Sequence, residues 1–346
     1  MSVNVAIIGG GIWAREQHLP AVEAAKELNL KAVFSRSFAS AQSVADRASC
    51  PVDLYSNDSD KGYTDLLRRP DIDAVIISLP IPNQAQYIRE ALKAGKHVLS
   101  EKPVCANVQE AEDLIKWYRS EIKDATWAVA ENFRFLNSFI DAAEQLKSLG
   151  RIIGFQGREH MFIEPDFPFH LTEWRRNPTH QGGYVLDFGV HFMASLRMLL
   201  AVQPGNEVAR VSAFTNLIQP HLRPVDTADA ILRTRSGVTG TFQIHRGTTL
   251  RAGELTVACE KGSVTVEWDK VTIRRDGQEE VRKVANEGYG VAPVVRAWGE
   301  SIFGGKLSWG QGPEAALGDL ELIELMLRSG EADGIPLDCT RQNAQE

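Results

Sequence analysis

The chain has 346 residues, of which 43% are hydrophobic and 24% are charged, a composition typical of a globular protein. Its formal net charge of −7 argues against electrostatic binding to nucleic acid. No apolar run approaches the roughly 18 residues that a membrane span requires. Four scattered cysteines lack Cys-x-x-Cys spacing and predict neither a metal site nor a disulfide framework. With no basic leader before the first strand pattern, we expect a cytoplasmic protein of two domains.

The first part of the chain, from residue 3 to about 130, alternates short apolar runs with helical patterns. Strands are predicted at Val3–Ile8, Ala32–Phe34, Asp73–Ser78, Val98–Leu99 and Trp127–Val129, with helices reaching about Leu28 and running from about Asn83 to Lys93. Near-continuous apolar strands that alternate with helices indicate a parallel sheet covered on both faces. We therefore predict an α/β fold with a Rossmann NAD(P)-binding domain over residues 1–131.

The pattern changes after about Asn132. A helix from Asn137 to Leu149 leads into runs with the alternation of antiparallel strands, at Arg210–Leu217, Thr227–Arg235, Val238–His245, Glu254–Ala258 and Ser263–Trp268. Apolar residues at helical spacing predict a last helix from about Glu314 to Arg328, and the polar tail after Thr340 is expected to fray. The prediction for residues 132–346 is an α+β domain.

A glycine-rich turn, Gly9-Gly10-Gly11-Ile12-Trp13-Ala14, follows the first strand and opens a helix. This is the context that a G-x-G-x-x-A pattern requires. Gly9 permits the tight turn, Gly11 lets the backbone approach a pyrophosphate, and Ala14 allows close packing of helix on strand. Free N–H groups at the helix N-terminus then face the phosphates. A plain glycine turn is the alternative, but the βαβ context favours a dinucleotide site.

The second predicted strand ends at Ser35-Arg36-Ser37. An NAD-specific site usually has Asp or Glu at this point, bonded to the ribose 2′-hydroxyl. An arginine between two serines suits a 2′-phosphate by charge and by hydrogen bonding. NADP is therefore favoured over NAD, with a solvated loop arginine as the alternative.

Two further motifs place ionisable groups where folding alone explains them poorly. In Glu101-Lys102-Pro103 a lysine stands where a strand ends, at the edge of the sheet that binds ligands in open α/β folds. Asp187 and His191 lie four residues apart in an otherwise apolar helix and so share one face. Histidine exchanges a proton near neutral pH, and a carboxylate can orient its ring. A hydrogen-bonded core pair is the alternative for these two residues.

Together these motifs resemble the Gfo/Idh/MocA oxidoreductases over nearly the whole chain. The resemblance also includes the run from Ala94 to Pro103, Trp174-Arg175, Gly182-Gly183 before the Asp187-x-x-x-His191 helix, and the closing Arg328-Ser329-Gly330. It implies an NAD(P)-dependent dehydrogenase or reductase that transfers a hydride between the nicotinamide and a secondary alcohol or carbonyl carbon of a sugar, polyol or related small molecule. It also implies a second domain with a large, mostly antiparallel open sheet, which binds substrate and forms a homodimer or homotetramer.

The resemblance implies roles for individual residues. Lys102, Asp187 and His191 are the expected catalytic residues, with His191 as the base and Lys102 polarising the reacting oxygen. Arg134 and Tyr184 join these three as candidate substrate-binding residues. The candidate cofactor-binding residues are Gly9, Gly11, Ile12, Trp13, Ala14, Ser35, Arg36, Ser37, Ser78, Leu79, Pro80, Asn83, Glu101, Lys102, Trp174 and Arg175, and three loop histidines are weaker candidates for the pocket, His160, His170 and His180.

Three positions depart from the family pattern: Tyr184 replaces a third glycine, Ala194 an aspartate, and Gln86 a histidine. They leave the substrate open. Two alternative functions also remain, a catalytically silent dinucleotide-sensing regulator of the same fold and a reductase of a biosynthetic ketone or imine. An intact set of proton-transfer groups speaks against the sensor.

Overall fold

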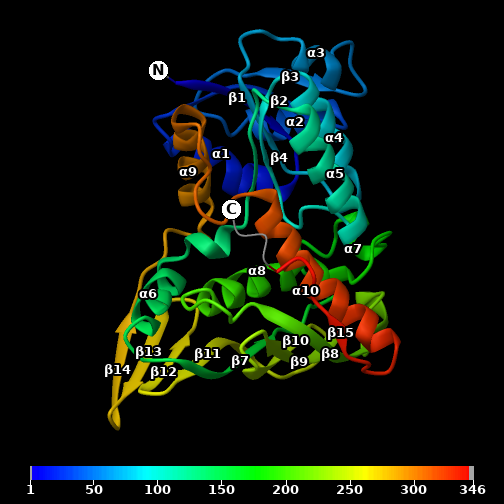
Figure 1. Ribbon diagram of the computed structural model, residues 1–346. Coiled ribbons are helices and arrows are strands. Elements are labelled where there is room, and N and C mark those ends of the chain that lie inside the picture. The colour runs from blue at the N-terminus through cyan, green and yellow to red at the C-terminus, as the bar shows by residue number, and fades with distance from the viewer. Residues whose placement is uncertain (1, 343–346) are drawn as a thin grey trace. The chain divides into compact units, whose positions relative to one another are not determined.

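The structure is a computed structural model that describes residues 2–342 (Figure 1). The chain forms two compact units. The first runs to Asn132 and includes Gly288–Ala316, and the second comprises Phe133–Glu287 and the residues from Leu317 onward. None of the helices in the described part of the chain combines the length and apolar character needed to cross a membrane.

The first unit contains a six-stranded sheet in the order β3-β2-β1-β4-β5-β6, with every neighbouring pair parallel. Its strands are β1 (Val3–Ile8), β2 (Leu28–Ser35), β3 (Asp53–Ser56), β4 (Ala74–Ile77), β5 (His97–Ser100) and β6 (Trp127–Val129). The four residues of β4 are fully buried, as expected for a strand covered on both faces. The predicted Rossmann sheet is confirmed, and its strand order reverses between β1 and β4, where such folds bind ligands at the carboxyl edge.

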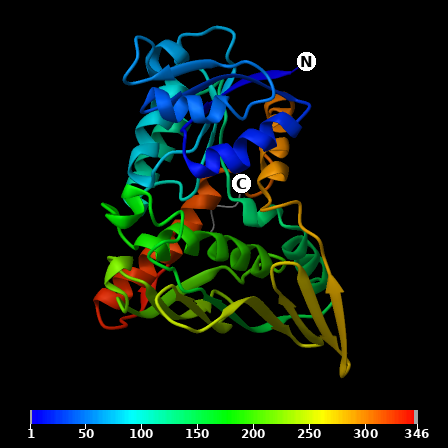
Figure 2. The ribbon, with the colours of Figure 1, turned by 180° about the vertical axis from the view of Figure 1, so that it is seen from behind.

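Helices cover both faces of this sheet. They are a π-helical turn η1 (Ala14–His18), α1 (Leu19–Ala24), α2 (Phe38–Ala45), α3 (Tyr63–Leu67), α4 (Ile81–Lys93), α5 (Val108–Glu121) and α9 (Val291–Gly304). Figures 1 and 2 show α1 and α9 on one side of the sheet and α4 and α5 on the other. The first helix ends at Ala24 rather than near Leu28, because Ala25 adopts an extended conformation and Leu28 already begins β2.

Helix α9 joins the first unit although the sequence prediction assigned everything after residue 131 to the second domain. Its Trp298 is fully buried. Gly299 packs so closely on β2 that an added Cβ would lie 3.1 Å from Cδ2 of Leu28. In the loop after α9, the carbonyl of Gln311 accepts a 2.8 Å hydrogen bond from the Val129 amide. Residues 288–316 therefore complete the Rossmann unit.

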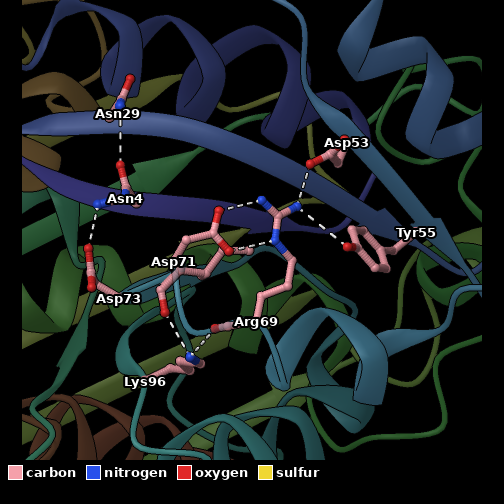
Figure 3. Close-up of polar contacts among 9 residues, drawn as sticks. Asn4, Asn29, Asp53, Tyr55, Arg69, Asp71, Asp73 and Lys96 are labelled. Atoms are coloured by element: carbon pink, nitrogen blue, oxygen red, sulfur yellow. Dashed lines mark hydrogen bonds and ion pairs between the residues drawn. The ribbon is translucent and has the colours of Figure 1, made fainter.

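Polar contacts tie together the amino ends of the strands in this unit (Figure 3). The guanidinium of Arg69 donates to Asp71 at 2.6 Å and to Asp53 at 2.5 Å. The ammonium of Lys96 donates to the carbonyls of Arg69 and Ile72 at 2.8 and 2.7 Å. These bonds join the amino ends of neighbouring strands, whereas open α/β folds bind their ligands at the opposite, carboxyl edge.

The second unit contains a nine-stranded sheet in the order β14-β13-β12-β11-β7-β10-β9-β8-β15. Strands β7 and β10 run parallel, and the other neighbouring pairs are antiparallel. The strands are β7 (Ile152–His160), β8 (Val208–Asn216), β9 (Thr227–Thr234), β10 (Thr239–His245), β11 (Ala252–Cys259), β12 (Gly262–Val266), β13 (Lys270–Arg275), β14 (Gln278–Lys283) and β15 (Leu337–Asp338). The predicted large, mostly antiparallel sheet is confirmed, although β7, β13, β14 and β15 were not foreseen.

One face of this sheet is covered by α6 (Asn137–Leu146), α8 (Gly183–Leu200) and α10 (Pro313–Glu331), as Figure 1 shows. Gly189 of α8 is wedged in this layer, since an added Cβ would lie 2.7 Å from Ile323 of α10 and 2.9 Å from Ile244 of β10. The opposite face exposes Phe214 and Ile231, each with about 60% of its surface accessible. The sheet is therefore open on one side.

Residues 341 and 342 are more ordered than the predicted frayed tail. Gln342 is 1% exposed, and its amide donates to the carbonyl of Gly318 and to Glu321, each at 2.8 Å. The prediction is thus wrong for residues 341 and 342, whereas residues 343–346 lie outside the described part of the chain.

Candidate active site

The glycine turn after β1 combines close packing with one open backbone position. Gly9 has a φ of +128°, and an added Cβ would lie 2.1 Å from the carbonyl oxygen of Ser78. At Gly10 the same atom would lie 2.5 Å from the carbonyl oxygen of Ser40. Around Gly11, by contrast, nothing lies within 4 Å of an added Cβ. Gly9 and Gly10 therefore pack against neighbouring backbone, whereas the space beside Gly11 is open. This arrangement fits the close approach of a pyrophosphate to the backbone of Gly11.

The end of β2 presents a cation beside the same edge of the sheet. Ser35 is buried, and Ser37 caps the N-terminus of α2, where its hydroxyl accepts a 3.3 Å hydrogen bond from the Ser40 amide. Arg36 is exposed between them and makes no hydrogen bond or ion pair with another described residue. Its five donors are therefore available to an anionic group.

The turn after β5 is fixed by a buried contact that the sequence did not reveal. His18 of η1 is fully buried, and its Nε2 lies 2.7 Å from Oε1 of Glu101. The other carboxylate oxygen of Glu101 accepts a 3.2 Å hydrogen bond from the Lys102 amide. The peptide bond between Lys102 and Pro103 is cis. The carbonyl of Pro103 accepts a 3.3 Å hydrogen bond from the side-chain amide of Gln84. Glu101 thus links the helix of the glycine turn to the backbone that carries Lys102.

The parallel topology gathers the candidate residues of the first unit along one edge. Each candidate lies at or just after the carboxyl end of a strand. Because parallel strands all end on the same side of the sheet, these residues share one edge. The residues placed there are Gly9, Gly11, Ile12, Trp13, Ala14, Ser35, Arg36, Ser37, Ser78, Leu79, Pro80, Asn83, Glu101 and Lys102. This set offers backbone donors, one exposed arginine and one lysine.

In the second unit, the glycine pair before α8 allows a loop to approach the helix. Gly182 and Gly183 both have positive φ values, +75° and +46°. An added Cβ on Gly183 would lie 2.6 Å from the carbonyl oxygen of Arg223 and 3.0 Å from Cδ of Pro224. Gly183 is therefore required by the close contact of α8 with the loop before β9, whereas an added Cβ on Gly182 would lie 2.8 Å from Cδ1 of Leu327 in α10.

Asp187 and His191 are both buried in α8, at 3% and 8% exposure. Nε of Arg175 donates to Oδ2 of Asp187 at 2.8 Å. The ring of His191 stacks on Phe133, with centroids 4.5 Å apart and planes at 16°. Ser195, four residues after His191, donates from its hydroxyl to the backbone carbonyl of His191 at 3.0 Å. The helix therefore presents an arginine-bound carboxylate and an aromatic-packed imidazole.

Trp174 and Arg175, predicted to bind the cofactor, lie in the short helix α7 (Glu173–Arg176) of the second unit. The guanidinium carbon of Arg175 lies 4.0 Å from the centroid of the Trp174 ring. Because the same guanidinium holds Asp187, this pair positions a candidate catalytic carboxylate.

The two remaining substrate-binding candidates differ in their surroundings. Tyr184 is 2% exposed, its hydroxyl has no hydrogen-bond partner in residues 2–342, and burial raises its pKa. Arg134 instead lies in a buried ion pair, with Nη2 at 2.7 and 2.8 Å from the two carboxylate oxygens of Asp319. Nη1 of Arg197 reaches the same carboxylate at 2.6 Å. Neither Asp319 nor Arg197 was singled out from the sequence.

His160, His170 and His180 are all buried, and burial is the main cause that lowers the pKa of each. His160 is the last residue of β7, not a loop residue as the sequence suggested. His160 stacks on His245, with centroids 4.3 Å apart. The ring of His180 lies 6.0 Å from Trp174. Their neutral imidazoles can exchange hydrogen bonds without adding charge.

Comparison with known proteins supports a single family. Residues 3–126 match the family described as "Oxidoreductase family, NAD-binding Rossmann fold", and residues 142–265 match the "GFO/IDH/MocA C-terminal domain". Dehydrogenase FPY6 of Fusarium mangiferae is 39% identical over 343 residues, which cover 96% of this chain and 97% of that protein. A dTDP-3,4-didehydro-2,6-dideoxy-alpha-D-glucose 3-reductase of Actinomadura kijaniata is 30% identical over 68% of this chain and 66% of its own length.

Solved structures agree over the full length. An oxidoreductase from Thermotoga maritima superposes with a TM-score of 0.86 at 28% identity, with 98% of each chain covered. KijD10, a 3-ketoreductase from Actinomadura kijaniata crystallised with NADP and TDP-benzene, has the same fold, with a TM-score of 0.76 at 24% identity over 95% of this chain and 98% of that one. The fold, the open glycine turn and both family matches lead to one assignment: this chain is an NAD(P)-binding oxidoreductase and belongs to the Gfo/Idh/MocA family.

Proposed function

We propose that the protein is an NADP-dependent oxidoreductase that interconverts a secondary alcohol and a carbonyl on a sugar, polyol or related small molecule. The observation that carries the cofactor preference is Arg36, which is exposed where β2 ends and has no hydrogen bond or ion pair to any residue that the structure describes. A guanidinium at this position complements a 2′-phosphate, whereas an NAD site needs an acceptor for the 2′-hydroxyl. A D-xylose 1-dehydrogenase (NADP(+)) of Haloferax volcanii, 30% identical over 67% of this chain, supports the same preference.

The bound cofactor supplies a nicotinamide that accepts or returns a hydride. Lys102 donates a hydrogen bond to the reacting oxygen and stabilises the negative charge that develops there. His191 accepts the hydroxyl proton in the oxidative direction and returns it in the reductive one. These roles are our proposal for the two residues, and they rest on the family motif.

Asp187 and Glu101 act as positioning groups in this proposal. Arg175 holds the Asp187 carboxylate, which then orients the substrate or His191. His18 holds Glu101, which in turn fixes the backbone that carries Lys102. Trp174 and Arg175 remain proposed contacts of the cofactor, and Arg134 and Tyr184 remain proposed contacts of the substrate.

We also propose that the open face of the nine-stranded sheet forms a homodimer or homotetramer in the cytoplasm. The exposed Phe214 and Ile231 on the adjacent strands β8 and β9 support this, because large exposed apolar side chains favour association. Light scattering on the purified protein tests the assembly, and a Phe214→Asp variant should shift it towards the monomer.

Reduction of a biosynthetic ketone is the second candidate. Relatives from three actinomycetes, all named dTDP-3,4-didehydro-2,6-dideoxy-alpha-D-glucose 3-reductase, favour the reductive direction. The same fold and the same proposed residues serve either direction.

The test is a cofactor-linked assay on the purified protein. NADP⁺ is offered with aldoses, polyols and cyclitols, and NADPH with ketones and imines, while the absorbance of the reduced cofactor is followed. We expect turnover with NADP(H) and less with NAD(H). Tight NADP binding without turnover on either panel would replace the enzyme proposal by a dinucleotide sensor.

A further inference from the structure

Two polar atoms near the start of α8 are buried and have no hydrogen-bond partner within residues 2–342. The hydroxyl of Tyr184 and Nδ1 of His170 make no hydrogen bond to any described residue, and the two side chains belong to residues 2% and 4% exposed. Their rings are adjacent, with centroids 5.8 Å apart. Burying an unpaired polar group opposes folding, so most such groups in native proteins have partners. Two of them side by side point to a ligand that supplies the missing bonds.

A third imidazole borders this pair. The ring of His221 meets that of His170 edge-on, with centroids 5.4 Å apart. Nε2 of His221 lies 2.9 Å from the carbonyl oxygen of Ile163, which can only accept, so Nε2 carries the hydrogen. In the neutral ring Nδ1 is then an acceptor. Because His221 is partly exposed, the cluster reaches solvent along this side chain.

Apolar side chains complete the surroundings of these polar atoms. Tyr184 packs with Ile163 and Leu222 and lies 5.7 Å from the ring of Phe188. A few polar atoms set in apolar and aromatic surroundings are typical of small-molecule sites, where apolar contact gives affinity and the polar atoms fix orientation.

Two arginines near the cluster are each bound to a carboxylate. Arg175 is bound to Asp187. The guanidinium of Arg246, over the ring of Phe188, is bound to Glu159 at 2.9 Å.

His170 itself stays uncharged near neutral pH. Burial, followed by the effects of His221 and of the exposed Arg176, lowers its pKa. Arg176, which acts on His170, is exposed to solvent, and the guanidinium groups of Arg175 and Arg246 already hold carboxylates. Within the described residues, a carboxylate or phosphate entering this cluster would therefore gain no buried, unpaired cation in return for its lost hydration, whereas a hydroxyl would find both donors and acceptors.

We propose that Tyr184, His170 and His221 form a subsite that hydrogen-bonds the hydroxyl groups of an uncharged, polyhydroxylated substrate and rejects a carboxylate or phosphate at the same place. Tyr184 precedes Asp187 by three residues and His191 by seven, so all three lie on one face of α8. The subsite therefore continues the face that carries the candidate catalytic residues. That the bound molecule is the substrate of a reaction rests on the proposed function.

The test measures binding, which does not depend on turnover. The NADP⁺-saturated, full-length protein is titrated in a calorimeter with D-glucose, D-xylose and myo-inositol, and with D-gluconate and D-glucose 6-phosphate as charged probes. We expect at least one neutral probe to bind at least about tenfold more tightly than both charged probes. In Tyr184→Phe its Kd should rise about tenfold, the usual effect of one lost hydrogen bond. NADP⁺ affinity should not change.

Thermal unfolding separates this role from a structural one. Ligand-free Tyr184→Phe should melt no lower than the parent, because only an unpartnered hydroxyl is removed. The matched control is Tyr118→Phe in the first unit, whose hydroxyl accepts from the Trp127 amide at 3.1 Å. That variant should melt lower and leave the Kd of the neutral probe unchanged.

Two results would overturn the subsite: neutral probes that bind equally well to Tyr184→Phe, or no preference for neutral over charged probes, including no binding of either kind. The subsite and the reaction fail in different ways. Tyr184-dependent binding without turnover refutes the proposed reaction and keeps the subsite, whereas turnover with an unchanged KM in Tyr184→Phe refutes the subsite alone.

Discussion

Asp319 offers a sharp test of what the buried charges in the second unit do. Its carboxylate, 2% exposed, is bonded to Arg134 and Arg197, whose side chains are 2% and 6% exposed. Asp319→Asn keeps the size of the side chain but leaves two buried guanidinium groups without their anion. Removing one partner of a buried ion pair costs about 3–5 kcal/mol. For a domain of this size each kcal/mol lowers the melting temperature by about 2–4 °C, so we expect a loss of about 6–20 °C.

The assay is thermal and urea unfolding followed by circular dichroism, with Asp338→Asn as the matched control. Asp338 pairs with Arg210 in the same unit, but these side chains are 67% and 51% exposed, and a solvent-exposed pair contributes about 0–1 kcal/mol. A loss below about 1 kcal/mol for Asp319→Asn would refute the reasoning from burial.

Four other predictions concern the cofactor, the proton and the pH range. Gly9→Ala should lower NADP affinity at least about tenfold in a fluorescence titration, because the new Cβ would lie 2.1 Å from the Ser78 carbonyl oxygen; unchanged affinity would contradict the tight turn. Arg36→Asp should weaken NADP binding far more than NAD binding, and equal losses for both would remove the assignment of the 2′-phosphate site. His191→Ala should reduce turnover about 10²–10⁴-fold with NADP affinity nearly unchanged, and turnover within a few-fold of the parent would move the proton to another group. Burial lowers the pKa of His180 below its ordinary value of about 6.5, so the unfolded chain binds protons more readily and the free energy of unfolding should fall as the pH drops below about 6.5. His180→Gln should flatten that decline in urea titrations between pH 7 and 5, and an unaltered slope would show that other groups cause it.

The sequence predicts most of the first unit because its signals are local. The strand of β4 is an unbroken apolar run, and the glycine turn lies where a strand passes into a helix. By contrast, α9 became part of this unit only through distant contacts of Trp298 and Gly299, which no local pattern encodes. Domain boundaries drawn from composition miss such returning segments.

Strand β7 shows a second kind of failure. Two glycines and the charged pair Arg158-Glu159 interrupt the expected alternation of apolar residues. The structure supplies the reason for one of the glycines, since an added Cβ on Gly157 would lie 2.3 Å from the ring of Phe242. Gly157 is therefore required by the ring that packs on it, but in the sequence alone a glycine argues against a strand.

For the candidate site, the residues could be predicted but their partners could not. In a parallel sheet all strands end on the same edge. Motifs that follow the strands can therefore be predicted to lie together from the topology alone. Partners such as His18 for Glu101 come from positions 83 residues apart, and Asp319 lies 185 residues from Arg134. An isolated histidine or aspartate gives no sign of such a pairing.

The return of α9 to the first unit also has a consequence for biosynthesis. All six strands of the Rossmann sheet leave the ribosome before the whole of Phe133–Glu287, but the helix that packs on α1 follows only after that segment. Until then the helical layer that contains α1 lacks α9, and the site that buries Trp298 is incomplete. The second unit likewise needs Leu317 and the residues beyond it. Each unit combines two segments separated by part of the other, so the first cannot be completed before residues 288–316 are made, nor the second before those from Leu317 onward.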